Sequence, residues 1–281
     1  MSRQLLTLAN LTFVATGLLF GCSQGENQDE TPVTQEQGKL EIRANGEDFI
    51  REGFVSKDDW QISFDHVYVN LADITAYQTD PPFHAEANSD IQIKEEVSFE
   101  EAKTVDLAEG DESAEPILVQ ELAEAPAGKY NALAWKMVKG ESEPTEGQTL
   151  VMEGKAKKEE QTIDFTLKID QEYEYICGEF VGGERKGILE TGGAADLELT
   201  FHFDHVFGDA DASADDDTNT NALGFKPLAA LAEDGKLEVE MSELESQLSA
   251  KDYEKLEKAL MGLGHVGEGH CQDLTTTDTK N

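Results

Sequence analysis

The chain has 281 residues, of which 59 are Asp or Glu and 22 are Lys or Arg, so its formal net charge at pH 7 is −37. Nucleic-acid binding needs clustered Lys and Arg that displace counterions from phosphates, and this charge excludes nucleic acid as a partner. We interpret most of the carboxylates as a solvated surface that keeps the protein soluble, although such a surface also attracts cations.

The N-terminus has the layout of a secretory signal. Arg3 precedes a mostly apolar stretch over residues 5–20, and the small residue Gly21 comes directly before Cys22. A positive start, an apolar segment and a small residue before the cleavage point are typical of signal peptides. The stretch is short and contains polar residues, which argues against a transmembrane anchor. We therefore predict a signal peptide over residues 1–21.

The run Leu19-Phe20-Gly21-Cys22 resembles the lipobox of bacterial lipoproteins. This resemblance implies that Cys22 is acylated and becomes the mature N-terminus, which makes a membrane the first expected partner. Ser23 stands where the inner-membrane retention signal of such lipoproteins has Asp, so the resemblance implies a cell-envelope location at the outer membrane. Residues 22–38 are nearly free of bulky apolar side chains and predict a flexible tether.

Residues 39–207 are expected to form a β-sandwich. Short runs of alternating apolar and polar residues are separated there by turn residues, which favours antiparallel sheets over βαβ units. The expected strands span residues 39–44, 60–70, 71–77, 92–99, 117–121, 129–138, 149–153, 162–169, 173–177 and 197–207. The predicted fold class is mainly β, an antiparallel β-sandwich with a short α-helical C-terminal extension.

The last part of the chain differs in character. Residues 208–224 are polar and rich in Asp, and they predict an acidic loop. Farther on, Ser242 and Ser249 each precede an acidic residue by three positions, a pattern typical of helix starts. Residues 225–281 are therefore expected to form a helical extension and a His- and Cys-rich tail, both packed on the sandwich.

Three cysteines are present. If Cys22 carries lipid, Cys177 and Cys271 remain as an even pair in an oxidising compartment, where disulfides persist. We therefore predict a disulfide between them rather than two free thiols. The chain-entropy model values a bridge across a loop of about 95 residues at roughly 4 kcal/mol.

A five-residue pattern with a central histidine occurs twice. Phe64-Asp65-His66-Val67-Tyr68 recurs as Phe203-Asp204-His205-Val206-Phe207. Strand alternation would place each histidine on a face that also carries aromatic rings. A buried histidine satisfies its ring nitrogens by hydrogen bonds or by binding a metal ion. His202 adds an HxxH spacing with His205, although on a strand these two would point to opposite faces unless a bulge intervened.

The C-terminal tail holds the remaining members of this set. The run 265–271 is rich in glycine, which permits a chain to wrap closely around an ion. A disulfide at Cys271 would hold this run near residues 173–177. The predicted ligands of a zinc or copper site are His66, His202, His205, His265 and His270. Asp65, Asp204 and Glu268 are expected as further ligands or as acceptors that orient the histidines.

Two motifs carry a second resemblance. The sequences HFDHVFGD, at residues 202–209, and LGHVGEGHC, at residues 263–271, are similar to those of a set of uncharacterised bacterial secreted lipoproteins. The similarity spans roughly residues 197–271. It implies a shared site and no named reaction.

Residues 209–215 offer oxygen side chains at alternate positions, as a calcium loop does. The four are Asp209, Asp211, Ser213 and Asp215. The glycine needed at the sixth position of such a loop is Ala214 here, so we favour an exposed acidic loop over a calcium site.

Signatures of common enzymes are missing from the sequence, including GxSxG, HExxH and a phosphate-binding glycine loop. We predict that the protein is not an enzyme. The expected function is binding of a transition-metal ion, zinc or copper, for uptake, storage or delivery to a membrane transporter or receptor. The alternative is an adhesive or scaffolding surface module whose histidines are structural and which has no metal site.

Overall fold

A computed structural model of the chain describes residues 36–87, 90–178, 187–267, 269 and 271–275. The chain divides into residues 1–34 and 35–281, and every described residue belongs to the second unit. The predicted signal peptide, Cys22 and nearly all of the predicted tether lie outside the described residues. Within the described part, no helix is both long and apolar enough to cross a membrane.

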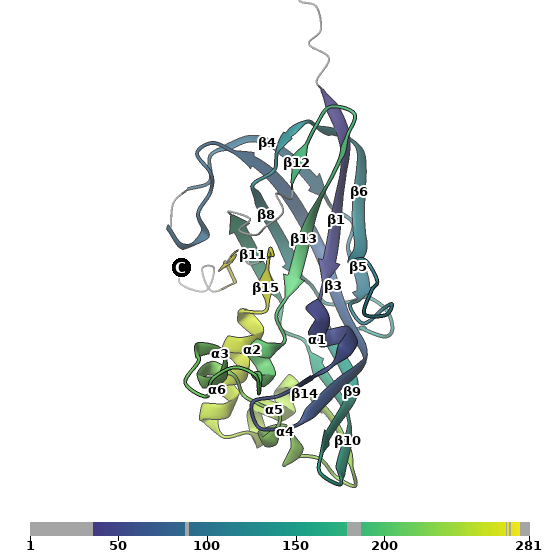
Figure 1. The fold of residues 1–281 in the computed structure, drawn as a ribbon, viewed down its shortest axis with the longest axis vertical. Coiled ribbons are helices and arrows are strands. Elements are labelled where there is room, and N and C mark those ends of the chain that lie inside the picture. The colour runs from purple at the N-terminus through teal and green to yellow at the C-terminus, as the bar shows by residue number, and fades with distance from the viewer. Residues whose placement is uncertain (1–35, 88–89, 179–186, 268, 270, 276–281) are drawn as a thin grey trace, which may run out of the picture. The chain divides into compact units, whose positions relative to one another are not determined.

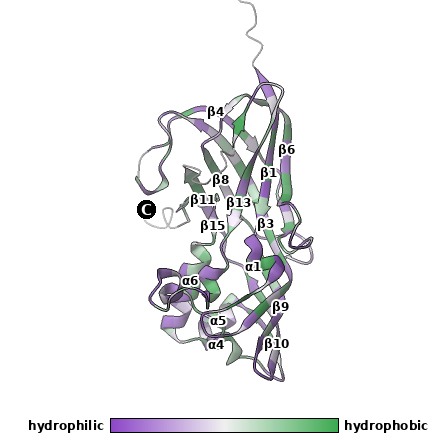
Figure 2. Cartoon of the chain, viewed as in Figure 1, coloured by the Kyte–Doolittle hydropathy of each residue, from purple (hydrophilic) through white to green (hydrophobic). Residues whose placement is uncertain are grey.

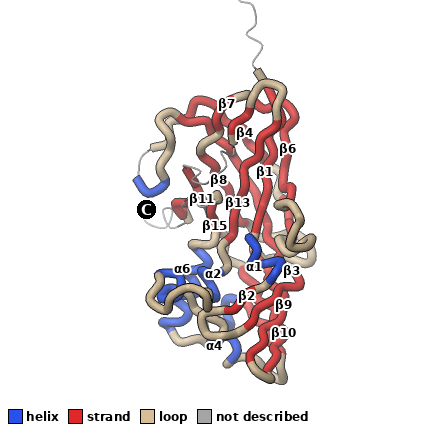
Figure 3. The backbone as a smooth tube through the Cα atoms, in the orientation of Figure 1, coloured by secondary structure: helices blue, strands red, loops and turns tan. Residues whose placement is uncertain are grey.

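The fold is mainly β, as predicted (Figures 1 and 3). The smaller main sheet has four strands in the order β15-β13-β1-β6. Their bounds are β1 Gln37–Asn45, β6 Ile117–Pro126, β13 Ala194–Phe201 and β15 Gly264–His265. Strands β1 and β13 run parallel, and the other two ladders are antiparallel.

The larger sheet has the main path β14-β10-β9-β3-β8-β11-β16, with β2, β4 and β5 also paired to the long strand β3. The strands on the path are β3 Gln61–Thr79, β8 Ala132–Met137, β9 Leu150–Lys158, β10 Gln161–Ile169, β11 Tyr173–Gly178, β14 Lys236–Glu240 and β16 Cys271–Asp273. The others are β2 Phe54–Val55, β4 Ile93–Phe99 and β5 Lys103–Asp106, while β7 Gly128–Lys129 and β12 Ile188–Leu189 form a separate pair. Because β14 is parallel to β10, both main sheets are mixed rather than purely antiparallel.

Short helices accompany the sheets, and α2 to α6 gather at one end of the strands (Figure 1). The helices are α1 Glu47–Glu52, α2 Asp204–Phe207, α3 Asp217–Asn221, α4 Lys226–Ala229, α5 Met241–Gln247 and α6 Ala250–Met261, with a 3-10 turn at Ala85–Ala87. The predicted helix start at Ser249 is confirmed, because its hydroxyl accepts the N–H of Asp252. The predicted start at Ser242 is wrong by two residues, since Glu240 caps α5 in a reciprocal pair with Glu243.

The C-terminal part of the chain also contributes strands to both main sheets. Strand β14 extends the larger sheet beside β10, β16 pairs with β11, and β15 pairs with β13. The buried residues of β14 are Leu237 and Val239, which occupy alternate positions in a strand of five residues. An alternation of only five residues, between two helices, is too short to predict a strand. The expected extension is therefore partly built into the sheets.

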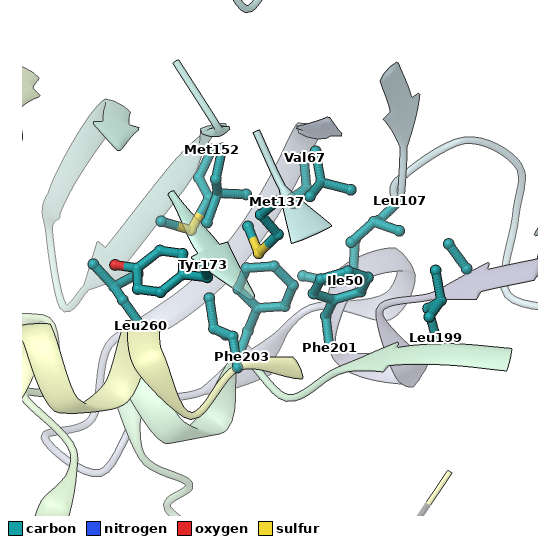
Figure 4. Packing of buried hydrophobic residues seen from close by; sticks show 14 of the residues in the cluster. Ile50, Val67, Leu107, Met137, Met152, Tyr173, Leu199, Phe201, Phe203 and Leu260 are labelled. Carbon is teal, nitrogen blue, oxygen red and sulfur yellow. The ribbon is translucent and has the colours of Figure 1, made fainter. Parts of the chain in front are cut away.

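One hydrophobic core joins the two main sheets to the helices. Alternate residues along β1 are buried, and the matching alternation of hydrophilic and hydrophobic residues is visible in Figure 2. Figure 4 shows Phe201, the last residue of β13, and Phe203, two residues later, packed near Met137 of β8 and Leu260 of α6. Phe201 and Phe203 are fully buried. The core therefore holds the chain firmly at the point where β13 ends.

Gly264 is a point of close packing in this core. A Cβ at this position would clash with the ring of Trp135 and would lie 3.1 Å from Cε2 of Tyr175. We expect Gly264→Ala to lower the free energy of unfolding by about 1–3 kcal/mol, because extra volume in a packed core forces its neighbours to move. Urea denaturation measures the change. The control is Gly262→Ala, where the nearest atom would be 3.4 Å away, and an equal loss in both variants would contradict the explanation.

Candidate metal centre

His202 and His205 lie at a change of structure. Strand β13 ends at Phe201, and the N–H of His205 donates to the carbonyl of His202 at 3.2 Å as the chain enters the helical turn α2. The prediction of a strand over residues 197–207 is therefore wrong after Phe201. Residues three apart in a helical turn lie on one side, so the expected separation of the two histidines onto opposite faces is removed.

The spacing of the aromatic residues in this segment fits both a strand and a helix. Phe203 and Phe207 are fully buried and are four residues apart. An even separation puts them on one face of a strand, and a separation of four puts them on one face of a helix. The apolar pattern could not distinguish the two, whereas the HxxH spacing fits only the helical turn.

His202, Asp204 and His205 form a cluster of possible metal ligands. One donor atom from each lies within 4.8 Å of the other two, and all three residues are half-buried. Among the described residues, no other set of three His, Cys, Asp or Glu side chains converges in this way. Zinc bonds of about 2.0–2.1 Å in a tetrahedron hold the donor atoms about 3.4 Å apart, so these three atoms would move closer together on binding and would fill three of the four positions.

The ring of His205 is oriented as in many metal sites. Its Nδ1 donates to the carbonyl of Gly262, at the end of α6, over 2.9 Å. A carbonyl can only accept, so Nδ1 carries the proton and Nε2 keeps a lone pair. A backbone carbonyl that fixes the tautomer of a ligating histidine in this way is common around bound metals.

His265 lies against the same two histidines. Its ring centroid is 4.3 Å from that of His202 and 5.2 Å from that of His205. Its Nε2 donates to the carbonyl of Gly262 at 3.2 Å, so one carbonyl orients two imidazoles. Three of the five predicted histidine ligands are therefore together, although His265 is not part of the group whose donor atoms lie within 4.8 Å.

Asp204 supplies the carboxylate of the cluster. Its Oδ1 is buried and accepts no hydrogen bond in the part of the chain that the structure describes. Buried carboxylate oxygens nearly always accept a hydrogen bond or contact a cation, because their desolvation is otherwise costly. This oxygen therefore fits a cation held at the cluster.

Glu47 is a neighbour of the cluster that the sequence did not identify. Its Oε2 lies 3.6 Å from Nδ1 of His202. Its backbone has a φ of 58°, which costs a non-glycine residue on the order of 1–3 kcal/mol, and its N–H donates to Oδ1 of Asn45 at 2.9 Å. The Asn45-Gly46 pair signals a turn, but nothing in the sequence places that turn beside His202.

The structure does not bring His66 and Asp65 into the cluster. A bulge between Phe64 and His66 shifts the strand by one residue, so His66 is exposed where alternation predicted burial. Nδ1 of His66 pairs with Oδ2 of Asp106 at 2.7 Å, and Asp65 pairs with Lys155 at 2.6 Å. These two predicted site residues belong to surface ion pairs.

The ion pair of His66 predicts a pH dependence. The hydrogen bond to Asp106 is the main cause that raises the pKa of His66 above its usual value. A raised pKa stabilises the folded protein below about pH 6.5, and this contribution disappears as the pH rises through the folded pKa. The stability difference between wild type and His66→Gln should therefore be larger at pH 5.5 than at pH 9 in urea denaturation.

The matched background for this test is Asp106→Asn, which keeps an oxygen for the N–H groups of Val67 and Ala108. In that background, His66→Gln should have nearly the same effect at both pH values. A larger stability difference at pH 9 than at pH 5.5 in the wild-type background would refute the interpretation.

The acidic segment after α2 is organised by an amide rather than by clustered carboxylates. Asn219 is buried, and its Nδ2 donates to the carbonyls of Asp209, Ala212 and Ser213 at 2.7–3.2 Å. Its Oδ1 accepts the N–H of Asp209. Three backbone carbonyls of this segment therefore accept hydrogen bonds from one amide. Asn219 lies in helix α3, so the prediction of a loop over residues 208–224 is wrong for α3.

The predicted disulfide between Cys177 and Cys271 is confirmed. The two residues face each other across the β11–β16 ladder. The bridge fixes β16, while β15, which carries His265, pairs with the end of β13 next to His202. Two further predicted ligands, Glu268 and His270, lie outside the described residues.

One member of the cluster, His205, lines a cavity. This cavity of about 400 Å³ is lined by His205 together with Asp217, Asn221 and Lys258. His202 and Asp204 are not among the residues that line this cavity, so it meets the cluster at His205.

The chain offers a convergent His-Asp-His group, a third adjacent imidazole and a cavity beside His205. Its charge of −37 favours the approach of cations. Comparison of the chain with known protein families, with curated proteins and with solved structures finds no match.

Proposed function

We propose that this protein binds one transition-metal ion, zinc or copper, through His202, Asp204 and His205. The observation that supports this most directly is the convergence of their donor atoms within 4.8 Å. Two imidazoles and one carboxylate suit zinc and copper(II), whereas calcium and magnesium prefer sites made wholly of oxygen.

His265 is our candidate for the next donor. Its ring already contacts His202 and His205, and the strand pairing of β15 holds its backbone. A rotation of the ring would exchange its hydrogen bond with Gly262 for a bond to the ion. Glu47 would remain beside His202 as an acceptor that orients the ring.

We propose a binding role rather than a catalytic one, because His265 as a fourth donor would close the coordination of zinc, whereas catalytic zinc sites keep one position open. The cavity at His205 would allow the ion to enter and leave, which suits uptake, storage or delivery. With the lipobox resemblance at Cys22, the proposal places the protein on a lipid anchor in the cell envelope, at the outer membrane. A membrane transporter or receptor would receive the ion.

The test is a competition titration of the untagged full chain with zinc, copper or calcium against a chromophoric chelator. The proposal predicts removal of one zinc or copper per chain from the chelator and no binding of calcium. The variant with His66→Ala and His84→Ala, which changes histidines outside the cluster, should bind as wild type does. An inability to compete for zinc or copper, or a loss of binding in this variant, would refute the proposed site.

The rival function is a scaffolding or adhesive surface module. One observation favours it, namely that the carbonyl of Gly262 gives both His205 and His265 a structural hydrogen bond. Such a module would leave the chelator fully loaded in the same titration.

A further inference from the structure

A second cavity lies on the other side of α6 from the one at His205. It measures about 430 Å³ and is lined by residues of β11, α5 and α6 and of the turn before β11. Its lining residues include Asp170, Tyr173, Glu245, Tyr253, Glu257 and Met261. We call it the Tyr173 cavity. It shares no lining residue with the cavity at His205, and it contains no member of the His-Asp-His cluster.

Helix α6 presents a regular stripe to this cavity. Tyr253, Glu257 and Met261 are spaced by four residues and so lie on one face of the helix. Leu256 and Leu260 are buried on the core side. The stripe therefore presents an aromatic ring, a carboxylate and a thioether to the cavity.

Tyr173 is a mostly buried side chain whose hydroxyl oxygen is accessible. Only 4% of its surface is exposed, it lines the cavity, and its hydroxyl makes no hydrogen bond within the described residues. Its oxygen is not among the fully buried polar atoms that lack a hydrogen bond, so the hydroxyl is open to solvent or to a ligand. Burial, and next the charge of Asp273, raise the pKa of Tyr173, so the hydroxyl stays protonated and neutral. The cavity therefore contains an unused group that can both donate and accept a hydrogen bond.

The charge of the lining is negative. Glu245 and Glu257 form neither an ion pair nor a hydrogen bond in the described part of the chain, whereas Asp170 pairs with Lys139 at 3.1 Å. No Lys, Arg or His is among the residues that line this cavity. After burial, the charges of Glu257 and Glu245 are the main causes that raise the pKa of Tyr253. An anionic ligand would be repelled, whereas a cation would meet carboxylates and aromatic faces.

We propose that the Tyr173 cavity binds a small aliphatic amine of the polyamine type. One ammonium group would pair with Glu245 and Glu257 and donate to the Tyr173 hydroxyl. The methylene groups would lie against Met241, which is nearly buried, and against Met261 and the ring of Tyr253. The proposal does not depend on the metal site.

The test is isothermal titration calorimetry of the full chain with spermidine in about 0.15 M NaCl, where surface attraction is screened. One saturable site is expected. Tyr173→Phe should weaken binding about tenfold, because the hydrogen bond to a charged group is lost. The variant with Glu245→Gln and Glu257→Gln should weaken it more. The control pair, Glu100→Gln and Glu101→Gln, makes the same change of charge on an exposed turn and should bind as wild type does.

A lack of saturable binding would overturn the proposal, as would an equal loss in the control pair, which would mean general attraction to an acidic surface. Tighter binding of a lysine amide than of spermidine would assign the cavity to a lysine side chain of a protein partner and would also overturn it. Thermal melting verifies that Tyr173→Phe folds. The two glutamates are exposed, so their variant tests the site even if Tyr173→Phe does not fold.

Discussion

Replacing His202 and His205 together with alanine is expected to weaken zinc binding by about a thousandfold or more. Even groups that only orient a ligand cost about 10–100-fold when removed, and this variant removes two of the three converging donors. Asp204→Asn should weaken binding less, because it keeps an oxygen but loses the charge. The competition titration with a chelator measures the zinc affinity of the wild type, of the double variant and of Asp204→Asn.

The matched control for this variant is the pair His66→Ala and His84→Ala, which removes the same number of imidazoles. His66 is exposed and paired with Asp106, so its loss should leave the zinc affinity unchanged. If both double variants lost affinity equally, the ion would bind to histidines in general and the cluster would have no special role.

Removal of the disulfide is expected to have the largest effect on stability. The variant with Cys177→Ala and Cys271→Ala should lose about 4 kcal/mol of the free energy of unfolding, since the bridge joins residues separated by 94 positions. Cys177 is fully buried in the core, so the lost sulfur also leaves unfilled space. Urea denaturation of oxidised and reduced wild type separates the two causes, because reduction opens the bridge and leaves both sulfur atoms in place.

The disulfide also bears on the metal proposal. Residue 271 is six positions after His265, so the bridge anchors the chain shortly after β15. Reduction should therefore lower the zinc affinity if His265 is a ligand, but it should leave a site made of His202, Asp204 and His205 largely intact. Unchanged stability after reduction would contradict the structural role assigned to the bridge.

The strands were predictable where alternation ran long enough to exclude a helix. The segment that forms β3, Gln61–Thr79, was expected as two successive strands, and β10 was recognised almost to its ends. Short helices and short strands are not predictable in this way. Helix α1 has six residues and strand β14 has five, and the pattern in so short a segment is too weak to identify either. The parallel pairing of β1 with β13 follows from contacts between distant segments and has no local signal.

The candidate site was predictable in part. The HxxH spacing and the intervening Asp204 are visible in the sequence, and the pairing of Cys177 with Cys271 follows from the cysteine count. The prediction for His66 is wrong because of a single bulge, which inverts the side chains after it as far as Leu71 and leaves no trace in the composition of the strand. A second register shift between Ala72 and Thr75 restores the original alternation. Glu47 and the carbonyl of Gly262 act through tertiary contacts with His202 and His205, and a backbone carbonyl cannot be identified from residue type.

The central claim is that a transition-metal ion binds at His202, Asp204 and His205. Anomalous diffraction at the zinc absorption edge, from crystals of the full chain grown with one equivalent of zinc, tests it most directly. The account predicts one strong peak about 2.0–2.1 Å from Nε2 of His205 and within bonding distance of His202 and Asp204. A peak at other residues with none at this cluster would contradict it.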